Sequence, residues 1–511
     1  MIQSKTIARR KHLNGNNTVV NGKTSNKRPS NARTYRSIPK LLCVICLVSL
    51  LFLGIVYLRN KSNIVLKNSE PHGMLHPPNP QIIDTKVIPS YTPLHIFQHA
   101  AVCSDSELCS RIGRDMFKKN GSIIDATLAT MFCAGMTNMQ SMGIGGGFVM
   151  NIYIKSEQKA YTLDAREISA IAATEDMHLH DPSTTNEGPL SIATPGELKG
   201  YWEAHKRFGK LSWKEIMQPC IEICKNGFEM SKHMYDSLHT NSKVQFDRQL
   251  REMYFDDITH EFYKPGTIIK PNLICKTLEY IAENGGNSLY HGKLADELAE
   301  DLKDLGSIIT KKDLESYDVR WNDSIPIDIN GDTMYVIPPP ACGVLVSFII
   351  NILKNYNFKP DDLSTVNSTI LTYHRIIEAF KHTYGKRTLI GDPKFVNIDD
   401  LVRDLTSPEY AEKIRLKIHD DSTKQLPQDY GAQFYMEDSH GTAHISVIGR
   451  DGKVKLVVGA AGGTKITTAV AMNFENRHCL RNRILHSEIP EPEVGSIINS
   501  TAAYRNVVPF I

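Results

Sequence analysis

The stretch Asp438-Ser439-His440-Gly441-Thr442-Ala443-His444-Ile445-Ser446-Val447 decides the fold predicted for this chain. From Ala443 to Val447 apolar and polar residues alternate, a period-2 pattern that is typical of a half-buried strand. Gly441 lets the backbone bend sharply, which exposes the residue that follows. Two interpretations stay open: Thr442 is an ordinary strand start, or it is a latent N-terminal nucleophile released when the chain cuts itself between Gly441 and Thr442.

A second strand and a pair of glycines come after this stretch. Lys453 to Val458 is predicted to be a strand, and a helix is predicted to start near Ile466. Between them lie Gly462 and Gly463. Glycines at a helix N-terminus present backbone N–H groups that can stabilise an anion, including the oxyanion of an acyl-transfer intermediate. The alternative is a tight turn between strand and helix with no chemical role.

A glycine-rich loop lies between a helix and a strand in the first third of the globular region. Apolar spacing predicts a helix over Arg111–Thr137, and the loop Gln140–Phe148 leads into a strand over Val149–Ile154. Phosphate-binding loops need the order strand, loop, helix, with a lysine in the P-loop case. The order here is reversed and no such lysine is present, so we interpret the loop as one where two backbones approach closely.

An arginine follows the next predicted strand. Tyr161 to Asp164 has strand character, and Arg166-Glu167 comes directly after it. An arginine at a strand end is suited to binding a carboxylate through two parallel hydrogen bonds, although a plain surface arginine remains the alternative. Helices are predicted to dominate from there to about Tyr317, and Tyr373–Tyr384 is predicted to be a helix with its large apolar residues on one face.

The N-terminal part predicts a membrane protein. The chain has 511 residues and a formal net charge of +3, which does not indicate any particular class of binding partner. Residues 1–40 are basic and lack acidic residues, which indicates a disordered tail, with a nucleic-acid-binding arm as the alternative. Leu41 to Leu58 is uncharged and about long enough to cross a bilayer, with a buried soluble helix as the alternative. The basic residues before it predict a signal-anchor with the N-terminus in the cytosol and the rest outside.

Cysteines and sequons agree with export. Eight cysteines follow the apolar run, a setting in which disulfides persist. They show no zinc-type spacing, so no metal site is expected. Triplets that match the acceptor pattern for N-linked glycans include those that begin at Asn120, Asn322, Asn367 and Asn499.

Several of these motifs, in this order, resemble the gamma-glutamyltransferase family (gamma-glutamyl transpeptidases, glutathione hydrolases). The resemblance runs from about Ala100 to about Ala469. Its strongest segments are Gln140–Phe148, Asp164–Glu167, Thr194–Gly200, Tyr373–Phe395, Gly441–Val447 and Val457–Thr468. The predicted single-pass type II topology is similar to that of the animal enzymes, which places the catalytic region outside the plasma membrane.

The resemblance implies a fold, a reaction and a set of residues. It implies the α+β N-terminal-nucleophile hydrolase fold, a four-layer αββα sandwich, in a proenzyme that cuts itself into a large and a small subunit. It implies no cofactor, glutathione and other gamma-glutamyl donors as substrates, and water, amino acids or dipeptides as acceptors. The residues carried over are Thr442 as nucleophile, Gly441-Thr442 as autocleavage junction, Arg166 for the donor's α-carboxylate, Gly462 and Gly463 for the oxyanion hole, and a Cys109–Cys133 disulfide.

The sequence departs from the family pattern after Val447. The family has a Thr-x-Asn segment, an acidic pair for the donor's α-amino group and a Ser-Ser pair, and none of these is found between Val447 and Val457. We therefore expect an internally shortened small-subunit region and a C-terminal part that is truncated relative to the family. Two hypotheses follow: an active gamma-glutamyl hydrolase and transpeptidase, or an impaired or unprocessed membrane glycoprotein of the same family. The predicted parts are a cytoplasmic tail (1–40), a signal-anchor (41–58), a stalk (59–93), a large-subunit region (94–441) and a small-subunit region (442–511).

Overall fold

The computed structural model describes residues 96–174, 176–185, 188–240, 245–246, 248–434, 442–449 and 454–460. The chain divides into two units, Met1–Lys86 and Val87–Ile511, and every described residue belongs to the second. The predicted tail, signal-anchor and stalk lie outside the described residues. Among the helices that the structure does describe, none has the length and apolar character needed to span a bilayer.

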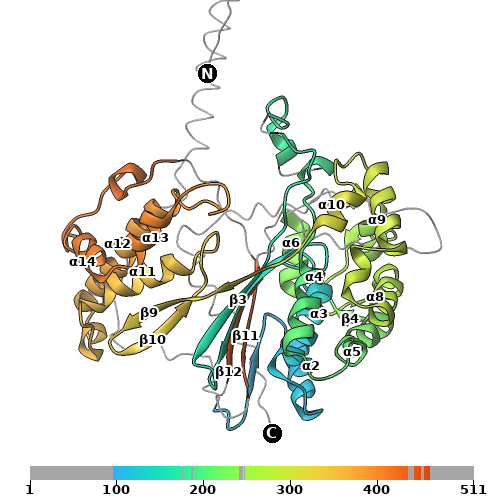
Figure 1. The fold of residues 1–511 in the computed structure, drawn as a ribbon, viewed down its shortest axis with the longest axis horizontal. Coiled ribbons are helices and arrows are strands. Elements are labelled where there is room, and N and C mark those ends of the chain that lie inside the picture. The colour runs from blue at the N-terminus through green and yellow to red at the C-terminus, as the bar shows by residue number, and fades with distance from the viewer. Residues whose placement is uncertain are drawn as a thin grey trace, which may run out of the picture. The chain divides into compact units, whose positions relative to one another are not determined.

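A six-stranded antiparallel sheet forms the centre of the second unit (Figure 1). In order across the sheet its strands are β1 (Ala101–Cys103), β11 (Ala443–Ile448), β12 (Val454–Ala460), β2 (Phe148–Ile154), β3 (Lys159–Ala165) and β8 (Arg320–Asp323). The strand predicted from the opening stretch is therefore confirmed as β11, and it pairs with β12 along its whole length. The described residues also form three two-stranded ribbons: β9–β10 (Ile325–Ile329 with Asp332–Val336), β4–β7 (Phe228–Glu229 with Ile268–Ile269) and β5–β6 (Phe255–Asp256 with Glu261–Phe262).

One face of this sheet is buried against helices, as Figure 1 shows for α3 and α4. Alternate residues of its strands point into this core, each at most 1 % exposed: Val102, Phe148, Met150, Ile152, Leu163, Ala165, Ala443, Ile445 and Val447. The helices on this side are α2 (Glu107–Lys118), α3 (Ile123–Thr137), α4 (Glu197–Phe208), α5 (Trp213–Asn226), α6 (Lys232–Thr240), α7 (Arg248–Tyr254), α8 (Asn272–Asn284), α9 (Lys293–Asp304) and α10 (Lys311–Ser316). The period-2 pattern of β11 thus predicts its buried face correctly.

The single helix predicted over Arg111–Thr137 is wrong, because the chain forms two helices there, α2 and α3. Asn120 has a left-handed backbone with φ of 62°, which ends the first helix. Ser122 begins the second: its hydroxyl accepts from Asp125 N–H (3.1 Å), and the Asp125 carboxylate accepts from Ser122 N–H (2.7 Å). This capping box satisfies N–H groups that a continuous helix would not expose.

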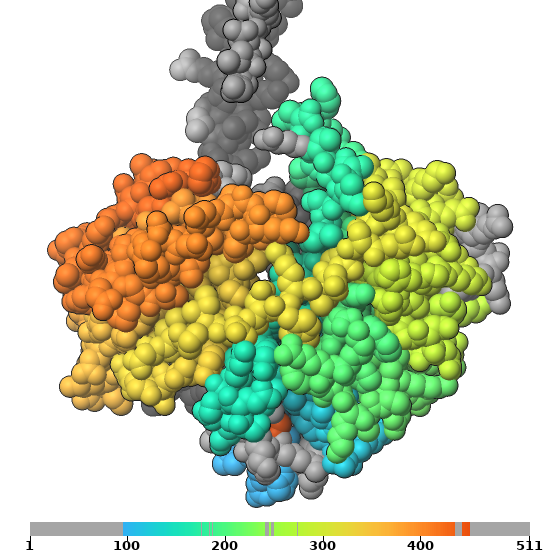
Figure 2. Space-filling view, in the orientation of Figure 1, coloured from blue at the N-terminus to red at the C-terminus, as the bar shows by residue number. Residues whose placement is uncertain are grey.

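A second hydrophobic cluster is built from the β9–β10 hairpin (Ile325–Ile329 and Asp332–Val336) and four helices. The helices are α11 (Gly343–Lys354), α12 (Val366–Arg387), α13 (Asp399–Thr406) and α14 (Pro408–Arg415). Figure 2 shows α11–α14 as one closely packed block, coloured yellow-orange to orange. The hairpin contacts the other face of the sheet, where the Asn151 side-chain amide donates to the Tyr335 carbonyl (2.9 Å). The four-layer arrangement stays a prediction, since the described residues contain one large sheet.

Candidate active site

The register of the sheet brings the predicted nucleophile and the predicted carboxylate-binding arginine to the same end. Thr442 directly precedes β11, Gly147 directly precedes β2, and Arg166 directly follows β3. The pairs that fix this alignment are Ala443–Ala460, Gly459–Val149 and Phe148–Ala165. Neighbouring strands lie about 4.8 Å apart, so the backbones at Thr442 and Arg166 are separated by roughly 14 Å. An arginine side chain and a glutamyl group together can bridge a gap of this size.

Thr442 is exposed at the start of its strand. Two residues after Thr442, His444 donates its backbone N–H to Asp105 Oδ2 (3.3 Å). The Nε2 atom of His444 lies 2.9 Å from Ser446 Oγ. Burial lowers the pKa of His444, so its ring is neutral near pH 7. The described residues do not include Gly441, Gly462 or Gly463. The strand β12 ends at Ala460, which lies at the same end of the sheet as Thr442.

Arg166 is held through its backbone, and its side chain lies beside an acid. Its N–H donates to Asp164 Oδ1 (3.0 Å), and its carbonyl accepts from the Tyr317 hydroxyl (2.8 Å). Its Nε lies 3.4 Å from Glu167 Oε2, and the Arg166 side chain is 37 % exposed. A guanidinium that is part-exposed at a strand end can bind a carboxylate.

The glycine-rich loop lies against two buried carboxyl groups. Glu197 accepts from Gly143 N–H (3.3 Å) and from the Tyr201 hydroxyl, while the backbone N–H of Glu197 donates to Gly146 O (2.9 Å). Burial raises the pKa of Glu197 to about 8, and the hydrogen bonds from Tyr201 and Gly143 offset only part of this effect. Burial also raises the pKa of Glu167, with Arg166 opposing the rise. The site therefore holds a mostly neutral Glu197 carboxyl group close to the Arg166–Glu167 pair.

Gly147 shows why this loop is rich in glycine. A Cβ atom at Gly147 would come 2.5 Å from the Ala165 carbonyl oxygen and 2.9 Å from Glu167 Oε2. No side chain fits at that distance, so only glycine permits this approach of the loop to the end of β3. The close-packing interpretation is supported by this geometry.

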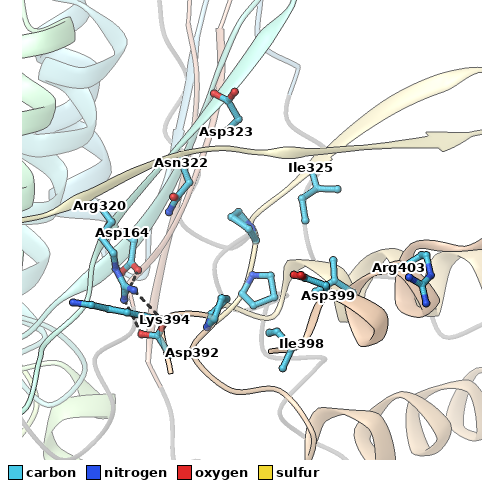
Figure 3. A pocket seen from close by; sticks show the side chains of 14 residues that line it. Asp164, Arg320, Asn322, Asp323, Ile325, Asp392, Lys394, Ile398, Asp399 and Arg403 are labelled. Carbon is cyan, nitrogen blue, oxygen red and sulfur yellow. Dashed lines mark hydrogen bonds and ion pairs between the residues drawn. The ribbon is translucent and has the colours of Figure 1, made fainter. Parts of the chain in front are cut away.

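A cavity of about 560 Å³ lies beyond β3, on the side of the edge strand β8 (Figure 3). Its lining is both charged and apolar and comprises Asp164, Arg320, Asn322, Asp323, Ile325, Pro338, Pro339, Asp392, Pro393, Lys394, Ile398, Asp399, Val402 and Arg403. The strand β8 is four strands from β11, or roughly 19 Å at the usual strand spacing. Thr442 is not among the residues that line the cavity, so we do not assign this cavity to the transfer step.

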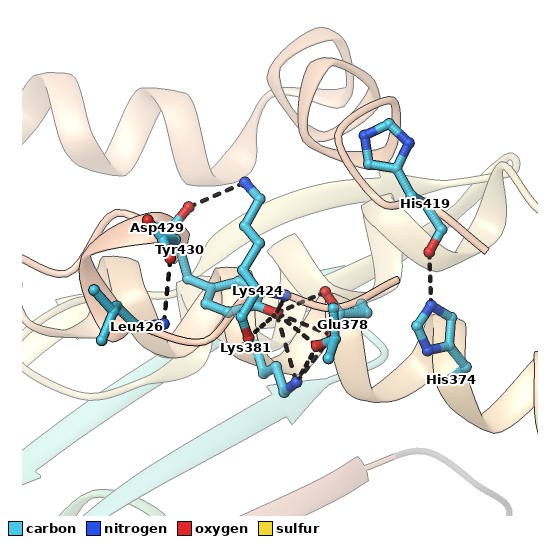
Figure 4. A network of polar contacts seen from close by, with 9 residues as sticks. His374, Glu378, Lys381, His419, Lys424, Leu426, Asp429 and Tyr430 are labelled. Atoms are coloured by element: carbon cyan, nitrogen blue, oxygen red, sulfur yellow. Dashed lines mark hydrogen bonds and ion pairs between the residues drawn. The ribbon is translucent and has the colours of Figure 1, made fainter. Parts of the chain in front are cut away.

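The segment before the predicted junction is anchored to α12 (Figure 4). The hydroxyl of Tyr430, in η6 (Pro427–Tyr430), lies 3.0 and 2.9 Å from the two carboxylate oxygens of Glu378 and accepts from Lys424 N–H (2.9 Å). Lys381 and Thr423 complete the network around Glu378. The chain is described to Phe434, eight residues before Thr442 in the sequence.

Two disulfides are present among the described residues. Cys109–Cys133 joins α2 to α3, as the resemblance implied. Cys224–Cys275 joins α5 to α8 and was not predicted, because the sequence gives no spacing signal for it. In the described part of the chain no cluster of three or more His, Cys, Asp or Glu residues is arranged to hold a metal ion.

Sequence reasoning missed the residues that surround the predicted site. Glu197 lies in one of the segments that carry the resemblance, yet its partner Gly143 is 54 residues away in the chain. Arg320 and Asp392 contact each other across 72 residues. Local patterns carry no signal for such pairs, since the fold alone makes them neighbours.

Comparison with known proteins identifies the family. The family model for gamma-glutamyltranspeptidase matches residues 109–454. The chain is 38% identical over 71% of its length to Scoloptoxin SSD14 of Scolopendra dehaani, and 36% identical over 68% of its length to Glutathione hydrolase 2 of Arabidopsis thaliana. It spans 63% and 60%, respectively, of these two relatives.

A solved structure agrees with this result. Gamma-glutamyltranspeptidase from Pseudomonas nitroreducens complexed with L-DON superposes with a TM-score of 0.56 at 30% identity, covering 64% of this chain and 96% of that one. The N-terminal-nucleophile hydrolase fold predicted for the chain is the fold of this relative. On its sequence and on its fold, the chain belongs to the gamma-glutamyltranspeptidase family.

Proposed function

We propose that this protein hydrolyses the gamma-glutamyl bond of glutathione and related donors, and transfers the gamma-glutamyl group to amino acids or dipeptides. Cleavage between Gly441 and Thr442 would free the α-amino group of Thr442. An α-amino group has a pKa of roughly 7.7–8.0, so near neutral pH it can take the proton of its own hydroxyl. The hydroxyl oxygen then attacks the gamma-glutamyl carbonyl, and the amine side of the donor leaves with a proton.

The observation that carries this proposal is the sheet register, which aligns the residue preceding β11 with the residue following β3. In the proposal, Arg166 binds the donor's α-carboxylate while the gamma-carbonyl faces Thr442. The N–H groups of Gly462 and Gly463 stabilise the oxyanion. Water or an acceptor amine resolves the acyl-enzyme at the same carbon.

The proposal extends to the setting of the reaction. Leu41–Leu58 anchors the chain in the plasma membrane as a single-pass type II protein, with the catalytic region outside the cell and glycans on some of its sequons. The processed protein is a heterodimer of its own fragments in a four-layer αββα sandwich. The apolar run and the basic segment before it support this topology.

Activity and processing are tested together on the full chain. Incubation with a gamma-glutamyl anilide and glycylglycine is expected to release the aniline, and N-terminal sequencing of the small fragment is expected to begin at Thr442. Thr442→Ala removes the hydroxyl, so it should give one long band and no release above background. Thr442→Ser keeps a hydroxyl and should retain slow cleavage. A single uncut band with no turnover in the wild-type chain would favour the unprocessed glycoprotein instead.

A further inference from the structure

Three charged side chains, Asp164, Arg320 and Asp392, meet in the cavity wall (Figure 3), and one of them also accepts the backbone N–H of Arg166. The Arg320 guanidinium donates two parallel hydrogen bonds to Asp392, from Nη1 to Oδ1 (3.1 Å) and from Nη2 to Oδ2 (3.0 Å). Arg320 Nη2 also lies 3.0 Å from Asp164 Oδ2. The other oxygen of Asp164 accepts the Arg166 N–H (3.0 Å). We call Asp164, Arg320 and Asp392 the acid–arginine relay.

The relay joins elements that are distant in the sequence. Asp164 is the last residue but one of β3, and Arg320 opens β8 and pairs with Asp164 across the sheet. Asp392 lies in the loop after α12, a helix that packs in the second hydrophobic cluster. The end of β3 is therefore held by Arg320 of β8, and Arg320 is held in turn by Asp392 in the loop after α12.

The relay fixes one of the two peptide groups that flank Arg166, and Tyr317 fixes the other. The N–H of Arg166 is bound by the Asp164 carboxylate and its carbonyl oxygen by the Tyr317 hydroxyl. With both groups fixed, the direction in which the Arg166 side chain leaves the strand is also fixed. A buried carboxylate that accepts a backbone N–H needs a further partner for its charge, and Arg320 supplies that partner for Asp164.

The Asp164 side chain is only 6 % exposed, whereas Arg320 is 37 % exposed. An exposed ion pair contributes little to stability, but removing the cation here would leave a buried carboxylate without compensation, which is costly. Asp164 would then turn toward water, which releases the Arg166 N–H.

We propose that Asp164, Arg320 and Asp392 are positioning residues that set the orientation of Arg166 toward the carboxylate of the gamma-glutamyl donor. This inference rests on the proposed function in one respect, namely that Arg166 binds that carboxylate. In this proposal the relay increases the affinity for the donor and does not affect the chemical step. A donor without an α-carboxylate gains nothing from the relay.

Steady-state kinetics separate these roles. Arg320→Gln is expected to raise KM for a gamma-glutamyl anilide about tenfold while kcat changes less than about twofold, the signature of lost binding rather than lost chemistry. Arg320→Lys keeps the charge but not the two parallel bonds, so its KM should fall between those of wild type and Arg320→Gln. For an anilide that lacks the α-carboxylate, Arg320→Gln should leave kcat/KM unchanged.

The matched control is Arg375→Gln. Arg375 makes an equivalent two-bond pair with Asp420, at 2.8 and 2.6 Å, on a part of α12 that is not joined to Arg166. It should leave KM and kcat at wild-type values. A fall in kcat at constant KM in Arg320→Gln, or an equal KM rise in Arg375→Gln, would overturn the relay.

Hydrogen exchange gives a readout that needs no turnover. In the full chain, amide exchange in the peptide that contains Arg166 should become faster in Arg320→Gln than in wild type, and should not change in Arg375→Gln. Equal exchange in wild type and Arg320→Gln would refute the relay even if the enzyme is active. A wild-type chain without activity would refute the proposed function, while the exchange comparison would still decide the relay.

Discussion

At the residue scale, two buried carboxyl groups, those of Glu167 and Glu197, lie against the glycine loop. Arg166 lies beside Glu167, whereas Glu197 is fully buried and accepts hydrogen bonds from Gly143 and Tyr201. Because burial raises the pKa of Glu197 to about 8, this group is mostly protonated at pH 7. A neutral Glu197 can support the loop without adding a second negative charge close to Glu167.

This protonation makes stability depend on pH. In the unfolded chain Glu197 titrates near its ordinary value of 4.5, and in the folded protein near 8. Between these values the folded state holds more protons than the unfolded state, so the free energy of unfolding falls as pH rises, by up to roughly 1.4 kcal/mol per pH unit. Glu197→Gln has no carboxyl group to titrate at this position, so its free energy of unfolding should not show this decrease with pH. In urea unfolding from pH 5 to pH 9, the variant's midpoint should therefore rise relative to wild type as pH increases.

The control for this series is Glu203→Gln on the same helix, where Glu203 pairs with Lys206 near the surface. Its midpoint should follow that of wild type at every pH. A difference between Glu197→Gln and wild type that stays constant from pH 5 to pH 9 would show that Glu197 is already charged in the folded protein.

At the scale of elements, sequence periodicity identifies most of the strands around the site but not the contacts between elements. The strands β2, β3, β11 and β12 are confirmed, because alternation of apolar residues reflects burial of one face of a sheet. The helix predicted over Tyr373–Tyr384 is confirmed inside α12, yet Tyr373 and Tyr384 are 53 % and 37 % exposed. The buried face instead contains Glu378, which no pattern of apolar residues could indicate.

The buried side of α12 is fixed by a contact that lies far away in the sequence. Tyr430 meets Glu378 across 52 residues, and hydrogen bonds from Thr423, Lys381 and Tyr430 outweigh the effect of burial and lower the pKa of Glu378. The same reasoning applies to Arg166, whose position at a strand end was predicted and whose supporting relay was not. Motifs locate single residues of the site, whereas the fold supplies their partners.

The Tyr430 contact gives a prediction for the segment that precedes the junction. Tyr430→Phe removes the hydroxyl from the Glu378 network and leaves buried acceptors with fewer donors, which should cost about 1–3 kcal/mol of unfolding free energy. If η6 also holds the path of the chain toward Gly441, cleavage before Thr442 should be slower in this variant. Both effects are measured by denaturant unfolding and by electrophoresis at timed intervals after synthesis.

Tyr410→Phe is the matched control, since Tyr410 packs against the second cluster, where its ring stacks on Phe348, and is not part of the Glu378 network. Its loss of a hydroxyl should leave the cleavage rate at the wild-type value. Equal cleavage rates in Tyr430→Phe and wild type would limit the Glu378 network to a role in stability.

At the scale of the whole second unit, the two hydrophobic clusters differ in how they are cross-linked. Both disulfides found in the described residues lie within the first cluster, between α2 and α3 and between α5 and α8. The second cluster, with Val344, Phe348 and Ile352 of α11 at its centre, depends on side-chain packing and on contacts such as Arg320–Asp392. Reduction should therefore affect the two clusters unequally.

The size of this effect follows from the loops that the disulfides close. With sequence separations of 24 and 51 residues, each bond is expected to contribute about 3–4 kcal/mol by restricting the unfolded chain. After reduction and alkylation, hydrogen exchange should become faster in peptides of α2, α3, α5 and α8 and change little in peptides of α11–α14. Replacing Cys224 and Cys275 together by serine should reproduce the change in α5 and α8 and leave α2 and α3 protected. Equal loss of protection in both clusters would mean that they unfold as one cooperative unit, because a stabilising bond in one cluster would then protect the other as well.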